Sequence, residues 1–202
     1  MGLVVSSLAG YLIGNINGGY IIGKAIGGID IREHGSKNAG ATNVNRVLGS
    51  KPAALALAID LFKGVAAVIT GRLLGGGDAG AILAGLAVIC GHNWPVFLGF
   101  KGGKGVATSL GVLISLDLRV ALIILTIGVA IIIMTRYVSL ASVTCALLYP
   151  MLVAAFGLSM EMKVFSLVIS FFALLRHREN IKRLVKGQES KVSIKLTQKK
   201  GD

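Results

Sequence analysis

Residues 118–135 read Leu-Arg-Val-Ala-Leu-Ile-Ile-Leu-Thr-Ile-Gly-Val-Ala-Ile-Ile-Ile-Met-Thr, with Arg119 near the start as the one charged side chain. About 20 predominantly apolar residues are enough for an α-helix to cross the hydrocarbon core of a bilayer. The rest of the chain shares this character, because 54% of its 202 residues are hydrophobic and its mean hydropathy is +0.78. Soluble globular chains are rarely so apolar. The sequence therefore predicts an all-α membrane protein.

Six further apolar segments accompany this one, so we predict a polytopic bundle of seven transmembrane helices. The fourth is short, because Val106 to Leu116 gives only about 16 Å of helix at 1.5 Å per residue. No cleavable signal is expected, since the first span has no basic segment before it and contains Asn15 and Asn17. The predicted spans are 3–23, 52–72, 78–98, 105–116, 118–135, 138–156 and 162–175.

The Lys and Arg residues, which give the chain a net charge of +12, predict its orientation. Cytoplasmic loops of membrane proteins are enriched in these residues. A cytoplasmic C-terminus and an outside N-terminus put most of them on the inner side, and leave only Arg72, Arg119 and Lys163 outside. We expect residues 1–186 to form a single transmembrane domain and residues 187–202 a basic cytoplasmic tail. The protein is then a multi-pass membrane protein whose polar motifs face the cytoplasm.

Small and charged residues inside the spans have mainly structural interpretations. Glycines four residues apart, such as Gly10 and Gly14, let transmembrane helices approach closely. Asp60 and Lys63 share a helical face three residues apart, where an internal ion pair that braces the bundle and a functional role of intramembrane charges are both open, but we do not expect Asp60 to be the catalytic base. Cys90 and Cys145 lie in apolar segments and are expected to be buried hydrophobic side chains, not metal ligands or a disulfide.

Two polar segments carry the candidate chemistry. Residues 34–46 are rich in amides, hydroxyls and cations, and no acidic residue occurs between Glu33 and Asp60. Residues 102–105 read Gly-Gly-Lys-Gly and open the fourth span, where glycine amides and Lys104 are suited to bind an anion. Neither a Walker A loop nor a Rossmann loop fits this second segment. Alternatively, both segments are turns or non-specific anchors for lipid headgroups.

Further polar residues lie close to the predicted inner surface. His177 and Asn180 follow the last span and share a helical face, although a solvated basic helix explains them equally well. Ser139 and Ser142 share a face of the sixth span, where a bond to the helix backbone is the simpler explanation. Neither a His-x-x-x-x-Asp box, a Ser-His-Asp set nor a metal-binding motif is found. We expect no metal, no cofactor and no nucleic-acid partner.

The order of these motifs resembles the bacterial integral-membrane glycerol-3-phosphate acyltransferases that use acyl phosphate as donor. The resemblance extends over nearly the whole chain. Its most specific parts are the segment from Gly35 to Arg46 and the loop from Phe100 to Thr108. Shorter matches are Gly14-Asn15, Gly91-His92-Asn93 and His177-x-x-Asn180.

The resemblance implies that an acyl group moves from acyl phosphate to the 1-hydroxyl of glycerol 3-phosphate at a bacterial inner membrane. The products would be lysophosphatidate and phosphate, in the first step of phospholipid synthesis, with a functional link to an enzyme that makes acyl phosphate. Both substrates are anions, so cations and amides must offset their repulsion. The expected catalytic residues are Lys104, His177 and Asn180, and the expected substrate-binding residues are Ser36, Asn38, Thr42, Asn43, Arg46, Gly102, Gly103, Gly105 and Ser142.

Two questions stay open at the level of sequence. A phosphate oxygen of the substrate is one acceptor for the hydroxyl proton, since its second pKa is about 6, and His177 as general base is the other. A phosphate or organophosphate transporter would also use cationic loops, although no repeated halves with paired broken helices are visible. A scaffold that binds anionic lipid is a third function, for which so many Asn and Gly residues are not needed.

Overall fold

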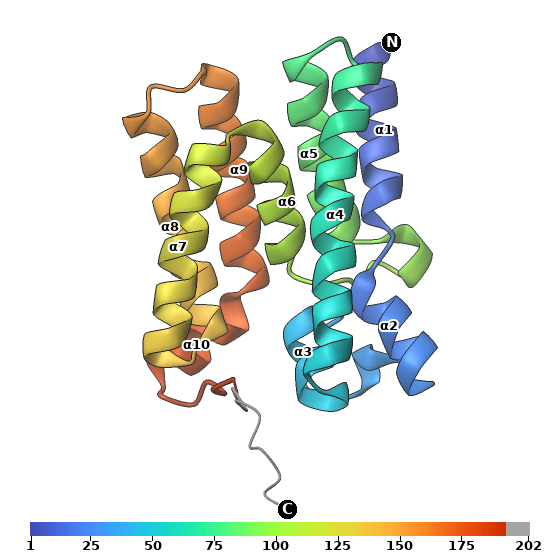
Figure 1. Cartoon of the computed structure of the whole chain (residues 1–202), viewed down its shortest axis with the longest axis vertical. Helices are drawn as coiled ribbons and strands as arrows, with labels where there is room; N and C mark the ends of the chain where they lie inside the picture. The colour runs from blue at the N-terminus through green and yellow to red at the C-terminus, as the bar shows by residue number, and fades with distance from the viewer. Residues whose placement is uncertain (193–202) are drawn as a thin grey trace, which may run out of the picture.

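The structure, a computed structural model, describes residues 1–192, and the regular elements within them are all helices. Helices α1, α4, α5, α7, α8 and α9 run along the long axis, and α6 lies between the group around α4 and the group of α7, α8 and α9 (Figure 1). The α-helices are α1 Gly2–Gly14, α2 Gly18–Gly27, α3 Ala41–Leu48, α4 Ser50–Leu74, α5 Asp78–Asn93, α6 Val106–Leu116, α7 Leu118–Thr135, α8 Val138–Ala155, α9 Met160–Arg176 and α10 Arg178–Val185. Two short 3₁₀ turns are η1 Ile31–Glu33 and η2 Val96–Leu98.

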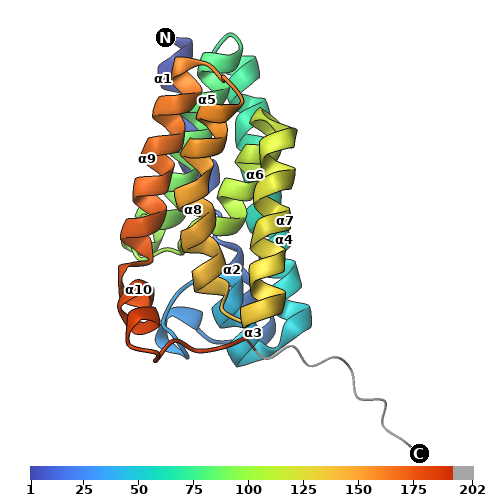
Figure 2. The ribbon, with the colours of Figure 1, turned by 90° about the vertical axis from the view of Figure 1, so that its left-hand side faces the viewer.

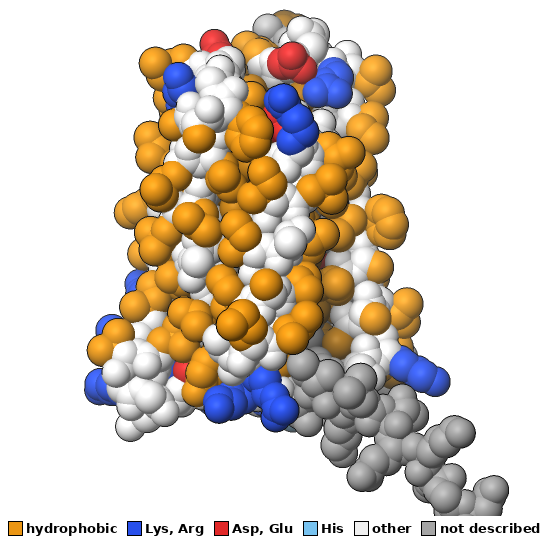
Figure 3. Space-filling view, turned by 60° about the vertical axis from the view of Figure 1, so that its left-hand side comes forward, with side chains coloured by type: hydrophobic (Ala, Val, Ile, Leu, Met, Phe, Trp, Pro, Cys, Tyr) orange, Lys and Arg blue, Asp and Glu red, His pale blue; other side chains and the backbone are white. Residues whose placement is uncertain are grey.

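The surface of the bundle fits a bilayer. Among the described residues, four helical segments are long and apolar enough to cross it: Ser50–Leu74, Asp78–Leu98, Leu118–Thr135 and Val138–Ala155. Hydrophobic side chains cover the middle of the face in Figure 3, and charged side chains gather toward its two ends. The prediction of an all-α membrane protein is confirmed, and so is the short fourth segment, because α6 has 11 residues. The count of seven crossings stays a prediction.

The first predicted span, 3–23, is wrong as a continuous helix. Helix α1 ends at Gly14 and α2 begins at Gly18. The polar residues between them explain the break, because Asn17 is the N-cap of α2 and its Oδ1 accepts a hydrogen bond from the Tyr20 amide at 3.0 Å. An Asn side chain that caps a helix start stabilises the interruption. The other predicted spans agree with α4 to α9 to within a few residues, except that α5 ends at Asn93, where the polar Gly91-His92-Asn93-Trp94-Pro95 segment begins to turn.

Close packing of α1 against α5 depends on glycine, as the spacing predicts. A Cβ added at Gly10 would overlap the backbone of Ala84, and one added at Gly14 would overlap the backbone of Val88 and Gly91. The helices therefore meet backbone to backbone, which small residues permit in membrane bundles.

The polar segments gather at one end of the bundle. Helices α2, α3 and α10 lie together at the end opposite the N-terminus, as both ribbon views show (Figures 1 and 2). The bundle thus brings the 34–46 segment and the start of α10, which are far apart in the sequence, to the same end of the molecule.

Candidate active site

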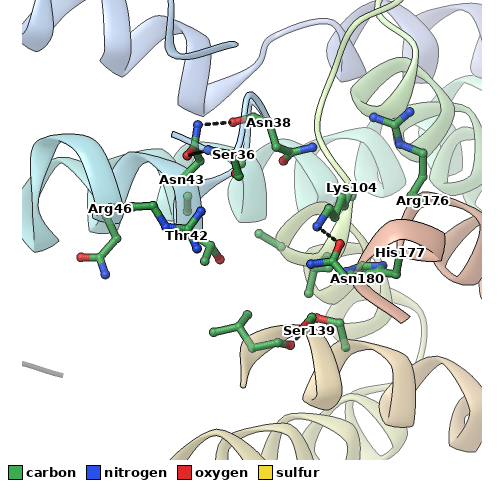
Figure 4. A pocket seen from close by; sticks show the side chains of 18 of the residues that line it. Ser36, Asn38, Thr42, Asn43, Arg46, Lys104, Ser139, Arg176, His177 and Asn180 are labelled. Atoms are coloured by element: carbon green, nitrogen blue, oxygen red, sulfur yellow. Dashed lines mark hydrogen bonds between the residues drawn. The ribbon is translucent and has the colours of Figure 1, made fainter. Parts of the chain in front are cut away.

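A large cavity, of about 1470 Å³, lies between these polar segments. Helix α3 and the loop before it form one wall, while the start of α6 and helix α10 form the other (Figure 4). The structure brings most of the predicted site residues to this cavity: Ser36, Asn38, Thr42, Asn43, Arg46, Lys104, Gly105, Ser142, His177 and Asn180 line it.

Asn43 organises the first wall. Its side chain is buried, and its Nδ2 donates to the carbonyl oxygens of Ile31, His34 and Asn38 at 2.9–3.0 Å. Its Oδ1 accepts from the Ser36 amide at 2.8 Å. Both N–H groups of the amide are thus used within the loop, one of them shared between two carbonyl oxygens, and its oxygen accepts one bond there. Asn43, which the sequence placed among the substrate-binding residues, therefore shapes this wall of the cavity, and its role in substrate binding stays a prediction.

The remaining polar side chains of this wall are available to a ligand. Within residues 1–192, no hydrogen-bond or ion-pair partner is found for the side chains of Ser36, Asn38, Thr42 and Arg46. In the close view their side chains lie on one side of the cavity, opposite Lys104 and Asn180 (Figure 4). Hydroxyl, amide and guanidinium donors of this kind suit the oxygens of a phosphate group.

Lys104 and Asn180 join across the second wall. The Lys104 Nζ donates to the Asn180 Oδ1 at 2.5 Å, which links the start of α6 to α10. Gly105 makes this placement possible, because its φ of +78° is a left-handed conformation that glycine adopts without strain. Lys104 therefore lies at the turn from which α6 begins, where backbone amides add to its positive charge.

The second wall holds two groups with altered pKa values. Burial, together with the positive charges of Arg183, Arg176 and Arg46, lowers the pKa of Lys104 to about 8, although Glu189 opposes this shift. Burial and the nearby Lys104 lower the pKa of His177 to about 4, so its ring is neutral at pH 7. The His177 Nδ1 lies 2.8 Å from the Ala173 carbonyl oxygen. Because a carbonyl only accepts, Nδ1 carries the proton and Nε2 is the free acceptor.

Gly102 and Gly103 do not line the cavity with Lys104 and Gly105. The Gly103 amide donates to the His92 carbonyl oxygen at 3.1 Å. On its other side the loop is held by Arg176, whose guanidinium donates to the carbonyl oxygens of Gly102 at 3.2 Å and Gly103 at 2.8 and 3.0 Å. A Cβ at either glycine would overlap His92. In this conformation the two glycines allow the loop to pack tightly, while the predicted amide cradle would need the Gly103 amide to be free.

Sequence reasoning missed part of the second wall. The Glu189 carboxylate accepts hydrogen bonds from Ser139 Oγ at 3.0 Å, Asn180 Nδ2 at 2.6 Å and Arg183 Nε at 2.7 Å. Burial opposes ionisation, but these three donors lower the pKa of Glu189, which is therefore a carboxylate at pH 7. No pattern of residues indicated this contact, because Glu189 lies beyond the last span, in the predicted tail. Ser142 lines the cavity but donates to the Val138 carbonyl oxygen at 2.9 Å, the helix bond considered from sequence.

The fold and this cavity define a polytopic membrane protein with a cavity lined by cationic and amide side chains. Among the described residues no three His, Cys, Asp or Glu side chains cluster as metal ligands would. A family model described as glycerol-3-phosphate acyltransferase matches residues 4–187. The chain belongs to this family.

Individual relatives agree over almost the full length. A glycerol-3-phosphate acyltransferase of Thermoanaerobacter sp. (strain X514) is 51% identical over 192 residues, which cover 95% of this chain and 96% of the relative. The corresponding protein of Alkaliphilus metalliredigens (strain QYMF) is 46% identical over 190 residues, 94% of this chain and 96% of the relative. Two crystal structures of PlsY (YgiH), an integral membrane glycerol 3-phosphate acyltransferase, match with 96% of each chain covered. The glycerol 3-phosphate form has a TM-score of 0.89 at 38% identity, and the lysophosphatidic acid form 0.86 at 37%.

Proposed function

We propose that the protein transfers an acyl group from acyl phosphate to the 1-hydroxyl of glycerol 3-phosphate, giving lysophosphatidate and inorganic phosphate. The observation that carries this proposal is the single cavity in which two sets of phosphate-binding groups face each other. Ser36, Asn38, Thr42 and Arg46 form one set, and Lys104 and Asn180 form the other, with His177 Nε2 beside them as a hydrogen-bond acceptor. Two anionic substrates held in one site need this excess of positive charge and donors.

The site divides between the substrates in this proposal. Arg46 and Ser36, with the Asn180 amide, hold the phosphate of glycerol 3-phosphate, and His177 Nε2 accepts a hydrogen bond from its 2-hydroxyl. Lys104, at the start of α6, holds the phosphate of the donor, which is also the leaving group. The acyl chain lies along apolar surfaces of the spans. Acyl phosphate is already activated, so positioning and charge neutralisation supply most of the rate.

The bond changes follow from this arrangement. The 1-hydroxyl oxygen attacks the acyl carbonyl carbon and forms the ester bond, while the bond from that carbon to the phosphate oxygen breaks. The phosphate leaves with the bonding electron pair. The hydroxyl proton passes to a phosphate oxygen, whose second pKa of about 6 is better matched to neutral pH than the pKa of His177, about 4.

The orientation and setting are part of the same proposal. Seven segments cross the inner membrane of a bacterial cell, and the cavity faces the cytoplasm, where glycerol 3-phosphate and an enzyme that makes acyl phosphate supply the substrates. The N- and C-terminal ends of the described chain lie at opposite ends of the bundle, which supports an odd number of crossings (Figure 1). Residues 1–186 are the acyltransferase domain and 187–202 a basic tail, of which residues 193–202 lie outside the described part.

The deciding experiment uses the purified full chain in detergent with radiolabelled glycerol 3-phosphate and palmitoyl phosphate. Labelled lysophosphatidate is the expected product, with one phosphate released per acyl group transferred. The absence of product would remove the proposal. Palmitoyl-CoA offered in place of palmitoyl phosphate tests the donor, and no lysophosphatidate is expected from it.

His177→Ala is expected to retain kcat within about tenfold and to raise the KM for glycerol 3-phosphate, because a base with a pKa of about 4 contributes little proton transfer at neutral pH. Steady-state kinetics with each substrate varied in turn give the two constants. His177→Asn is the matched control, since its amide can still donate to the Ala173 carbonyl oxygen. A loss of kcat by about 1,000-fold in both variants would make His177 the general base instead.

The pH dependence of kcat/KM is expected to fall as pH rises through about 8. Below this pH Lys104 is an ammonium ion, and above it the amine is neutral and no longer attracts phosphate. On the acid side the profile rises near pH 6, where the substrate phosphate becomes a dianion. Lys104→Arg, which stays charged at these pH values, should lose the basic limb. If kcat/KM of Lys104→Arg still fell near pH 8, the fall would belong to the titration of another group.

A further inference from the structure

Beneath the cavity lies a buried group of charged and polar side chains from two helices. Asp60 and Lys63 come from α4 and His92 from the end of α5, and their exposed fractions are 2%, 5% and 3%. Lys63 Nζ lies 2.7 Å from both Asp60 Oδ1 and His92 Nδ1. The ion pair between Asp60 and Lys63, one of the two interpretations that the sequence left open, is confirmed, but the sequence did not indicate that His92 joins it.

The same group holds the break between α1 and α2. Lys63 Nζ donates to the carbonyl oxygen of Gly14, the last residue of α1, at 3.3 Å and to that of Ile16, within the break, at 2.6 Å. Asp60 Oδ1 accepts from the Gly18 amide at 3.0 Å, which begins α2. Carbonyl oxygens freed by a helix break inside a membrane need such partners. The two charges thus satisfy backbone groups that neither helix satisfies internally.

His92 connects this group to the Gly102–Gly105 loop. An ammonium group only donates, so the His92 Nδ1 accepts from Lys63 and the ring proton is on Nε2. This bond fixes both the tautomer and the rotation of the ring. The ring packs against Gly103, and the His92 carbonyl oxygen accepts from the Gly103 amide at 3.1 Å. Lys104 is the next residue along the loop.

Stability alone is a poor reason for this arrangement. Taking a carboxylate and an ammonium ion out of water costs several kcal/mol for each, and well-packed apolar residues in place of a buried ion pair are often neutral or stabilising. Asp60 and His92 also line the cavity itself. Through His92 the group also contacts the loop that contains Lys104. This contact indicates that the group has a role in the site.

We propose that Asp60, Lys63 and His92 are positioning residues. Through the contact of His92 with Gly103 they hold the Gly102–Gly105 loop in place, and thereby position Lys104 against the donor phosphate. They do not contact substrate in this role. Helix α4 and the α1–α2 break hold Asp60 and Lys63 rigidly, and Lys63 in turn holds the His92 ring. Gly102 and Gly103 have no side chain, which allows the loop to pack closely against His92. The inference rests on the proposed function, because it assigns a reason for the placement of Lys104.

The test is the double variant Asp60→Asn/Lys63→Met, which leaves no unpaired buried charge and so avoids the large penalty of removing one partner. It also removes the donor of the Ile16 and Gly14 carbonyl oxygens, so its melting temperature is compared with that of the wild type before the kinetics. Its kcat/KM for palmitoyl phosphate should fall about 10- to 100-fold, since a displacement of about 1 Å in a catalytic group costs on that order. The KM for glycerol 3-phosphate, which is held mainly by the other wall, should stay close to that of the wild type.

The matched control is Arg72→Met/Asp78→Asn. It removes an ion pair of 3.2 Å between the same two helices, but the pair is exposed and does not line the cavity. This control should leave both KM values and kcat unchanged.

A second variant covers the case in which the double variant does not fold. His92→Asn keeps an acceptor for Lys63 but removes the ring beneath Gly103, and the same donor-specific loss is expected with an unchanged melting temperature. Equal loss of affinity for both substrates, or no loss in the folded variant, would overturn the positioning role. Wild-type protein that made no lysophosphatidate would instead overturn the proposed function.

Discussion

Lys104→Met is expected to lower kcat/KM by about 100- to 1,000-fold, the range found when one preorganised group that stabilises a developing negative charge is removed. Lys104 is partly buried, so water replaces its charge poorly. The variant also leaves the Asn180 Oδ1 without the donor that lies 2.5 Å away. The lost charge acts on the leaving phosphate, whose negative charge grows as the acyl bond breaks. Steady-state kinetics at pH 7 with palmitoyl phosphate as the varied substrate measure the loss.

Lys101→Met is the control in the same loop. Lys101 is three residues away, is exposed and does not line the cavity. The same charge is removed, so any general effect of net charge on the detergent-bound enzyme appears in both variants. A Lys104→Met enzyme within tenfold of the Lys101→Met enzyme would show that Lys104 does not hold the leaving group.

Much of the fold is predictable from the apolar segments, since burial in a bilayer demands long runs without charges. Helix α7 agrees with its predicted span because nothing polar interrupts residues 118–135. The first span differs because Asn15 and Asn17, which are both buried, end one helix and begin another. Hydropathy alone does not show where a polar residue caps a helix instead of packing inside one.

The site was predictable where a residue type matches phosphate chemistry. Lys104, Arg46 and Asn180 were expected on that ground, and the structure places all three at one cavity. The roles of residues that act through the backbone or through another side chain were not predictable from the sequence. Asn43 looks like a ligand-binding amide until its four hydrogen bonds within the loop are known. Glu189 approaches Asn180 only after the turn that follows α10, and no local pattern of residues predicts such a contact.

Arg46→Met is expected to raise the KM for glycerol 3-phosphate about 10- to 100-fold and to change kcat far less. A hydrogen bond to a charged group contributes about 1.5–3 kcal/mol, and 1.4 kcal/mol corresponds to a factor of ten in affinity. Within residues 1–192 no acidic side chain forms an ion pair with Arg46. Its charge is therefore available to the substrate phosphate.

Arg46→Lys separates charge from geometry. A guanidinium can bind two phosphate oxygens at once, whereas an ammonium ion acts as a point charge. Arg46→Lys should therefore recover only part of the affinity that Arg46→Met loses. Lys51→Met, an exposed charge at the start of α4 that does not line the cavity, serves as the control and should leave KM unchanged. If Arg46→Met lowered kcat and kcat/KM equally, Arg46 would act in the transition state, and the division of the two phosphates between the two walls would be wrong.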